Sequence, residues 1–195
     1  GNKPYRFYMN DYIKRFLNSD SGPAVLPLFS KYKNAHKEIT ESWGMVEAAK
    51  KFLTNFQDKI VYVVGDGKSP RTGAMFAYYT KAQVVSIDPQ FDVDFFLGWC
   101  KMQHNIGCPV RNLAVIKNRV EELDISAGGR DIVVVWPHSH ADMNIKFVKD
   151  YNNRVDIAMP CCVPIPPSLL SKPHISYKDN NVLSPKNIVH IFGLI

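Results

Sequence analysis

A run of five apolar residues that ends in a glycine-rich turn constrains the fold of this chain more than any other feature. Residues 60–64 read Ile-Val-Tyr-Val-Val, and Gly65-Asp66-Gly67 follows directly. β-Branched and aromatic residues favour a strand, and the residues after the turn, over 70–81, have a helical pattern. A second short strand pattern, 83–87, then leads into Asp88. This order is typical of a nucleotide-type cofactor site at the end of a parallel sheet: strand, tight turn, helix, strand and acid.

The turn needs its glycines because the chain must turn sharply there. Gly65 and Gly67 lack a Cβ, so that a ligand can lie against the backbone. We expect Ser69 to cap the next helix, and Pro70 suits its first turn, where no backbone N–H is needed. Gly73 falls on that first turn, where a small residue lets helix and sheet approach closely. Free N–H groups at this helix start favour electron-rich ligand atoms.

Two well-known glycine-rich loops fit this turn badly. A dinucleotide fingerprint requires a third glycine at position 70, where Pro70 stands. A phosphate-binding P-loop would end in Gly67-Lys68-Ser69, but it requires a glycine at position 62, which is Tyr62.

The turn instead resembles motif I of the class I S-adenosylmethionine-dependent methyltransferases. In these proteins the first strand ends with a G-x-G turn. In that family an acid that closes the second strand holds the ribose hydroxyls, and Ser86-Ile87-Asp88-Pro89 matches that position. Val63 stands where the family often carries an acid. The resemblance covers about residues 41–195 and implies S-adenosylmethionine as cofactor. The residues that it implies for cofactor binding are Gly65, Asp66, Gly67, Thr72, Gly73 and Asp88, with Asn118 and Arg119 beside the adenine.

Alternating helix and strand patterns predict an α/β fold with a Rossmann-like, doubly wound, mostly parallel sheet and helices on both faces. Helices are expected at about 40–56, 70–81, 91–104, 120–123 and 141–151, and strands at 60–64, 83–87, 113–116, 131–136 and 154–159. The proline-rich residues 160–173 are expected to be irregular, and 174–178 with 187–192 to form a terminal antiparallel pair. We expect one domain over 41–195, preceded by an N-terminal arm over 1–40.

The loop after the fourth expected strand is where methyltransferases usually carry their substrate-handling residues. Here it reads Trp136-Pro137-His138-Ser139-His140. His138 is the preferred general base and His140 the second candidate, because imidazole titrates near neutral pH. Trp136 is a candidate to stack on a flat substrate or on adenine. For each histidine alone, a solvated loop residue is the competing interpretation.

The four cysteines include the adjacent pair Cys161 and Cys162. They do not form a secreted disulfide framework, which favours an intracellular, reducing compartment such as the cytoplasm. A metal site built from this pair with His138 and His140 is conceivable, because neighbouring loops carry them. However, H-x-H with adjacent cysteines is not a usual zinc spacing. We therefore expect no metal, and a role for the pair as buried thiols.

The formal net charge of +6 and the pI of about 9.1 are compatible with a polyanionic partner. Basic residues alternate with aromatic ones over 1–40. This arm either binds nucleic acid through phosphates and bases, or packs its aromatic side chains on the domain, and we slightly favour the second interpretation. The sequence has no apolar run of membrane-spanning length and no signal-peptide pattern at its start, so we expect no membrane contact.

The resemblance implies methyl transfer to an acceptor that the sequence does not identify, with nucleic acid slightly preferred. The alternative is a catalytically degenerate Rossmann-like module that binds nucleic acid or a protein partner. Lys68 and Arg71 favour this alternative a little, since S-adenosylmethionine has no phosphate for them. A dinucleotide enzyme would use the same two cations on a pyrophosphate, but the missing third glycine argues against it.

Overall fold

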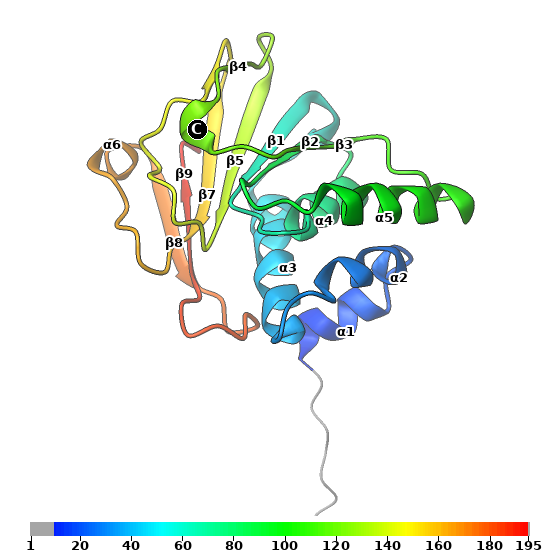
Figure 1. The fold of residues 1–195 in the computed structure, drawn as a ribbon. Helices are drawn as coiled ribbons and strands as arrows, with labels where there is room; N and C mark the ends of the chain where they lie inside the picture. Colours follow the sequence, from blue (N-terminus) through cyan, green and yellow to red (C-terminus); the bar gives the residue numbers. More distant parts are fainter. Residues whose placement is uncertain (1–9, 195) are drawn as a thin grey trace, which may run out of the picture.

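A seven-stranded sheet forms the centre of the computed structural model, which describes residues 10–194 (Figure 1). Its strands are β1 (Lys59–Val64), β2 (Gln83–Ile87), β3 (Leu113–Ile116), β5 (Asp131–Pro137), β7 (Arg154–Met159), β8 (His174–Lys178) and β9 (Ile188–Phe192). They lie in the order β3-β2-β1-β5-β7-β9-β8. The first five of these are parallel, and β9 is antiparallel to both β7 and β8. The predicted mostly parallel sheet with a terminal antiparallel pair is confirmed.

Most of the helices in the described residues cover one face of this sheet. They are α1 (Asp11–Leu17), α2 (Gly22–Val25), α3 (Ala35–Phe52), α4 (Arg71–Tyr79) and α5 (Val93–Asn105), with the 3-10 turns η1 (Leu26–Phe29) and η2 (Phe56–Asp58). Val63 and Val135 of the sheet are fully buried against Met45 of α3 and Met75 of α4. Helices α1 and α2 pack outside, on α3 and α4. Among residues 10–194, no helix combines the length and apolar character needed to cross a membrane.

The opposite face is covered mainly by extended chain. Its cover consists of the 3-10 turn η3 (Val120–Glu122), a small parallel sheet of β4 (Ile125–Ser126) and β6 (Val148–Lys149), and the short helix α6 (Pro167–Leu170). Phe147 lies edge-on to Tyr62 and to Trp136, with ring centroids 5.8 and 6.3 Å away. The helical cover on this face is therefore limited to η3 and α6.

Two predictions on this face are wrong. The helix expected at 141–151 is absent, and the segment forms turns and β6. The carboxylate of Asp142 accepts a hydrogen bond from the Asn144 N–H at 2.9 Å, so a side-chain turn competes with the helix there. The proline-rich segment 160–173 is not wholly irregular, because α6 begins at Pro167, where a first helical turn tolerates a missing N–H.

The described part of the N-terminal arm belongs to the domain's core. Phe16 of α1 is fully buried and lies edge-on to Phe29 and to Trp43 of α3, at 6.0 and 6.1 Å between centroids. Helix α3 runs across residue 40, so the described chain has no break at the expected boundary. This packing is what the second interpretation of the arm expects, while residues 1–9 lie outside the described part.

The strand order creates one place where a ligand can enter between loops. The chain moves outward from β1 through β2 to β3 and then returns to β5 on the other side of β1. In open α/β sheets, ligands bind outside the carboxyl ends of the strands at such a switch point. The loops after β1, β2, β3 and β5 all open at this edge.

Candidate functional site

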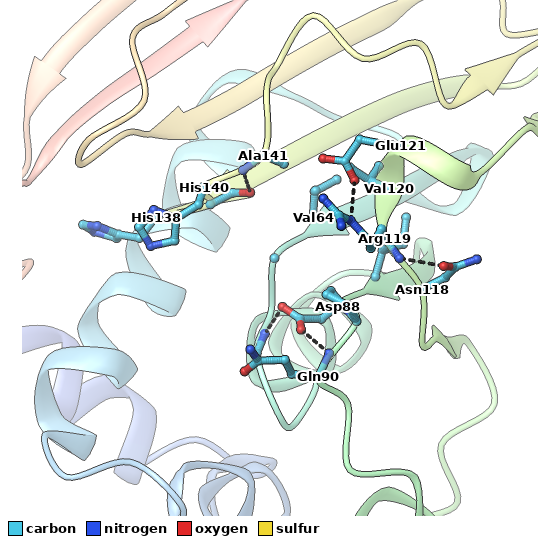
Figure 2. Close-up of a pocket in the computed structure, with 15 residues that line it drawn as sticks. Val64, Asp88, Gln90, Asn118, Arg119, Val120, Glu121, His138, His140 and Ala141 are labelled. Atoms are coloured by element: carbon cyan, nitrogen blue, oxygen red, sulfur yellow. Dashed lines mark hydrogen bonds and ion pairs between the residues drawn. The ribbon is translucent and has the colours of Figure 1, made fainter.

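A cavity of about 610 Å³ lies at this edge, between the four loops. Its volume is within the range of small-molecule sites. Seven of the residues predicted from the sequence line it, namely Gly65, Gly67, Asp88, Asn118, Arg119, His138 and His140. Figure 2 shows the two histidines at one end of the cavity, Asn118 and Arg119 at the other, and Asp88 between them.

Asp88 supports the glycine turn and faces the cavity at the same time. One carboxylate oxygen accepts a hydrogen bond from the Gly67 N–H at 2.8 Å, and the other accepts from the Gln90 N–H at 2.7 Å (Figure 2). Gly67 has a φ of 83°, a conformation that side chains other than glycine rarely adopt. Because a carboxylate has about four acceptor sites, Asp88 keeps acceptor capacity for ligand hydroxyls.

Asp66 lies on the core side of the same turn and does not line the cavity. Its fully buried carboxylate accepts from the N–H groups of Thr72 and Gly73, at 2.9 and 2.8 Å, and from the Ser86 hydroxyl at 2.6 Å. Burial raises the pKa of this carboxyl, whereas Arg71 and these three donors act in the opposite direction. Asp66 therefore accepts hydrogen bonds from N–H groups at the start of α4 that the sequence suggested were free for a ligand.

Thr72 and Gly73 are likewise structural rather than cavity residues. The Thr72 hydroxyl lies 2.7 Å from the Ser42 hydroxyl of α3, in a buried contact. A Cβ on Gly73 would approach the Ser86 Cβ to 3.0 Å, which confirms the predicted close contact of helix and sheet. The predicted Ser69 cap is wrong, because the Ser69 hydroxyl donates instead to the carbonyl of Leu28.

Arg71 holds the turn against α3 and the segment before it. Its guanidinium lies over the Tyr32 ring, 4.1 Å from the centroid, and pairs with Glu38 at 2.9 Å. It also donates to the Tyr32 hydroxyl and to the carbonyl of Asp66. Because these protein groups occupy the guanidinium, Arg71 does not support the phosphate ligand that the sequence suggested.

His138 lies on the cavity wall in a strained backbone conformation. Its φ is 47°, which is uncommon outside glycine and recurs at functional sites. The His138 Nε2 lies 3.5 Å from a carboxylate oxygen of Glu41, and Glu41 pairs with Lys37 at 3.0 Å. Burial, with the charges of Lys37 and Arg71, lowers the pKa of His138 to about 4. Burial and the neighbouring Glu38 raise the pKa of Glu41.

Trp136 is not available to stack on a ligand, so the sequence-based role is corrected here. Its side chain is 1% exposed and its Nε1 donates to the carboxylate of Asp156 at 2.9 Å. Arg154 in turn pairs with Asp156 at 2.8 Å. These contacts fix the indole in the core of the sheet face that carries Phe147.

Sequence reasoning missed several residues of the site. Ser139 touches the glycine turn, since a Cβ on Gly65 would come within 2.8 Å of its hydroxyl. Gln90 and Glu121 also line the cavity, and both follow predicted site residues closely enough to be found from the loop positions. Glu41 has no such signal, because its helix precedes β1 and only the fold brings it to His138.

No protein-family model and no curated protein matches the sequence. Among solved structures, a mutant of MtNAS in complex with S-adenosylmethionine is similar at a TM-score of 0.50 and 12% identity, over 93% of this chain and 70% of that one. A SAM-dependent methyltransferase from Aquifex aeolicus matches at a TM-score of 0.47 and 12% identity, over 77% of this chain and 89% of that one. The 23S rRNA methyltransferase ErmE matches at a TM-score of 0.43 and 10% identity, over 76% of this chain and 66% of that one. The chain thus has a Rossmann-like α/β fold similar to that of the first of these structures.

Proposed function

We propose that the cavity binds S-adenosylmethionine and that the protein transfers the methyl group to an acceptor that enters beside His138. The observation that carries this proposal is the position of Asp88. Its carboxylate closes β2, holds the Gly67 N–H at 2.8 Å, and faces the same cavity as the loop after β3. In the family that the sequence resembles, an acid in this position holds the ribose hydroxyls.

The residues present fit such a cofactor. Gly65 and Gly67 leave the turn without side chains, so that a ligand can lie against its backbone. Ile87 and Val120 add apolar wall near Asn118, where the resemblance implies the adenine. An apolar lining with a few placed polar groups is typical of small-molecule sites.

The protein's part in transfer is alignment of the acceptor and exclusion of water. Bound in the cavity, S-adenosylmethionine supplies an electrophilic methyl group on a sulfonium sulfur. His138 is our proposed base for the acceptor proton, because its ring lines the cavity at the end away from Asn118 and Arg119 (Figure 2). Glu41, 3.5 Å from the His138 Nε2, is placed to orient the ring.

Nucleic acid is our proposed acceptor class, on the basis of the positive net charge. The described part of the arm offers few free cations for it. Arg15, Lys31 and Lys37 form ion pairs with Glu47, Asp92 and Glu41. Lys14 and Lys33 are exposed and form no ion pair within residues 10–194. If they bind phosphates, Lys14→Ala and Lys33→Ala together lower RNA affinity and reduce its salt dependence, and an unchanged salt slope contradicts the proposal.

Calorimetric titration with S-adenosylhomocysteine, with NAD as the control ligand, tests the cofactor proposal. We expect micromolar binding of S-adenosylhomocysteine alone, and its loss in Asp88→Ala while the circular dichroism spectrum is retained. Asp94→Ala is the matched control, because Asp94 is an exposed acid outside the cavity. No heat with either ligand would favour the degenerate module over the enzyme.

A second variant separates the acceptor end of the cavity from the cofactor end. His138→Asn keeps a residue type that tolerates positive φ. We expect S-adenosylhomocysteine to bind this variant within about twofold of the wild-type affinity. A large loss of affinity would place His138 against the cofactor instead.

A further inference from the structure

Three side chains that commonly ligate metals meet at the rim of the cavity. His140 belongs to the loop after β5, and Cys161 and Cys162 to the loop after β7. The Cys162 sulfur lies 2.9 Å from the His140 Nδ1 and 3.4 Å from the Cys161 sulfur. One ligand atom from each residue lies within 4.8 Å of the other two. The proposed methyl transfer assigns no role to this cluster.

The register of the sheet explains why these distant residues meet. Strands β5 and β7 are parallel neighbours, and Pro137 pairs with Met159 where both strands end. His140 lies three residues beyond Pro137, and Cys162 lies three residues beyond Met159. The two loops therefore leave the sheet side by side, which brings His140 close to Cys162.

We propose that His140, Cys161 and Cys162 bind a zinc ion. In a tetrahedral site with Zn–S of about 2.3 Å and Zn–N of about 2.0 Å, ligand atoms lie about 3.5 to 3.8 Å apart. The observed separations of 2.9 and 3.4 Å are each within about 0.6 Å of these values, and the third pair of ligand atoms lies within 4.8 Å. Two thiolates with one imidazole favour zinc over magnesium or calcium, which prefer oxygen ligands. This proposal departs from the expectation of no metal, which was based on ligand spacing. The expectation that both thiols are buried is wrong, because Cys162 is exposed.

The site has three protein ligands and an open fourth position. Within residues 10–194, the cluster contains no further histidine, cysteine or carboxylate. His138 lies two residues from His140, but its Nε2 lies toward Glu41 and is not part of the cluster. Three protein ligands with one exchangeable position are the pattern of catalytic rather than structural zinc sites. His140 also lines the cavity, so the cluster adjoins it.

The test is titration of the reduced, chelator-stripped protein with Co²⁺ and Zn²⁺ under anaerobic conditions. We expect one equivalent of Co²⁺ to produce a thiolate charge-transfer band and the intense visible bands of a tetrahedral site, and Zn²⁺ to displace it. Cys162→Ser should weaken binding more than about tenfold. Cys108→Ser, which removes an exposed thiol outside the cluster, should leave binding unchanged.

Two results would overturn the proposal. One is wild-type protein that gives no cobalt bands, and the other is Cys162→Ser that binds as tightly as the wild type. Alkylation followed by mass spectrometry gives a second readout: Zn²⁺ should protect Cys161 and Cys162 and leave Cys108 reactive. Added imidazole should shift the visible bands if the fourth position is open, and unchanged bands would mean a closed site. None of these readouts depends on S-adenosylhomocysteine binding, so failure here is distinguishable from failure of the proposed function.

Discussion

Asp66 belongs to the glycine turn and Asp88 contacts it, but their carboxylates lie on opposite sides of it. Asp66 is completely buried, and its carboxylate accepts from two backbone N–H groups and a hydroxyl of the protein. Asp88 receives two backbone hydrogen bonds and lines the cavity. The position of each carboxylate, in the core or at the cavity, therefore separates an acid that holds the fold from one that is free to bind a ligand.

The same division extends to the neighbours of each acid. Thr72 and Gly73, in the first turn of α4, lie with Asp66 on the core side, whereas Gly67 lies with Asp88 at the cavity. Substitutions on the core side should therefore lower the free energy of unfolding and spare ligand affinity. Substitutions on the cavity side should lower ligand affinity and cost less stability.

The largest effect on stability is expected for Asp66→Ala. The N–H groups of Thr72 and Gly73 and the Ser86 hydroxyl would lose a buried acceptor. We expect the free energy of unfolding, measured by urea denaturation, to fall by about 3 kcal/mol. Ser86→Ala should cost about 1 kcal/mol as a partial control. A change below about 0.5 kcal/mol for Asp66→Ala would show that this carboxylate is not structural.

Arg71→Ala comes next, because it removes a buried guanidinium that packs on Tyr32 and pairs with Glu38. We expect a loss of about 2 kcal/mol in thermal or urea unfolding, from lost packing and an unpaired carboxylate. Affinity for S-adenosylhomocysteine should stay the same, since Arg71 does not line the cavity. Loss of affinity in a fully stable variant would place the guanidinium at the ligand.

Gly67→Ala should affect both stability and binding, because Gly67 lies on the boundary between the two sides. A Cβ there would lie 2.6 Å from the Tyr32 hydroxyl and 2.7 Å from an Arg71 nitrogen, at a φ of 83°. We expect about 1.5 kcal/mol of destabilisation and weaker S-adenosylhomocysteine binding.

Gly128→Ala is the matched control for Gly67→Ala. Gly128 also has a positive φ, of 60°, but a Cβ there would meet nothing within 4 Å. The difference in unfolding free energy between the two variants measures the crowding against Tyr32 and Arg71. Equal values would mean that only backbone strain matters at Gly67.

Asp88→Ala should have the smallest effect on stability and the largest on binding. It removes two hydrogen bonds to exposed or half-buried backbone groups, so we expect a loss of about 1 kcal/mol in urea unfolding. The affinity for S-adenosylhomocysteine should fall at least about tenfold, because a charged hydrogen bond contributes about 1.5 to 3 kcal/mol. The reverse result, stability lost and affinity kept, would abolish the distinction between Asp66 and Asp88.

Local patterns located most strands but not the direction of their side chains. The second strand was predicted at 83–87 and observed there, and the first was predicted at 60–64 and observed one residue longer. Trp136 ends a continuous apolar run that is buried on both faces. In such a strand the sequence does not indicate toward which face of the sheet a side chain points. The burial of Trp136 against Phe147 could therefore not be predicted.

The strand, the glycine turn, the next helix and Asp88 could be predicted from the sequence, because these features follow from residues adjacent along the chain. Three contacts could not be predicted: the Asp66 carboxylate at the start of α4, Glu41 facing His138, and His140 meeting Cys162. The last two contacts join loops and helices whose separation is set by strand register and helix packing. No local pattern of residues encodes that separation.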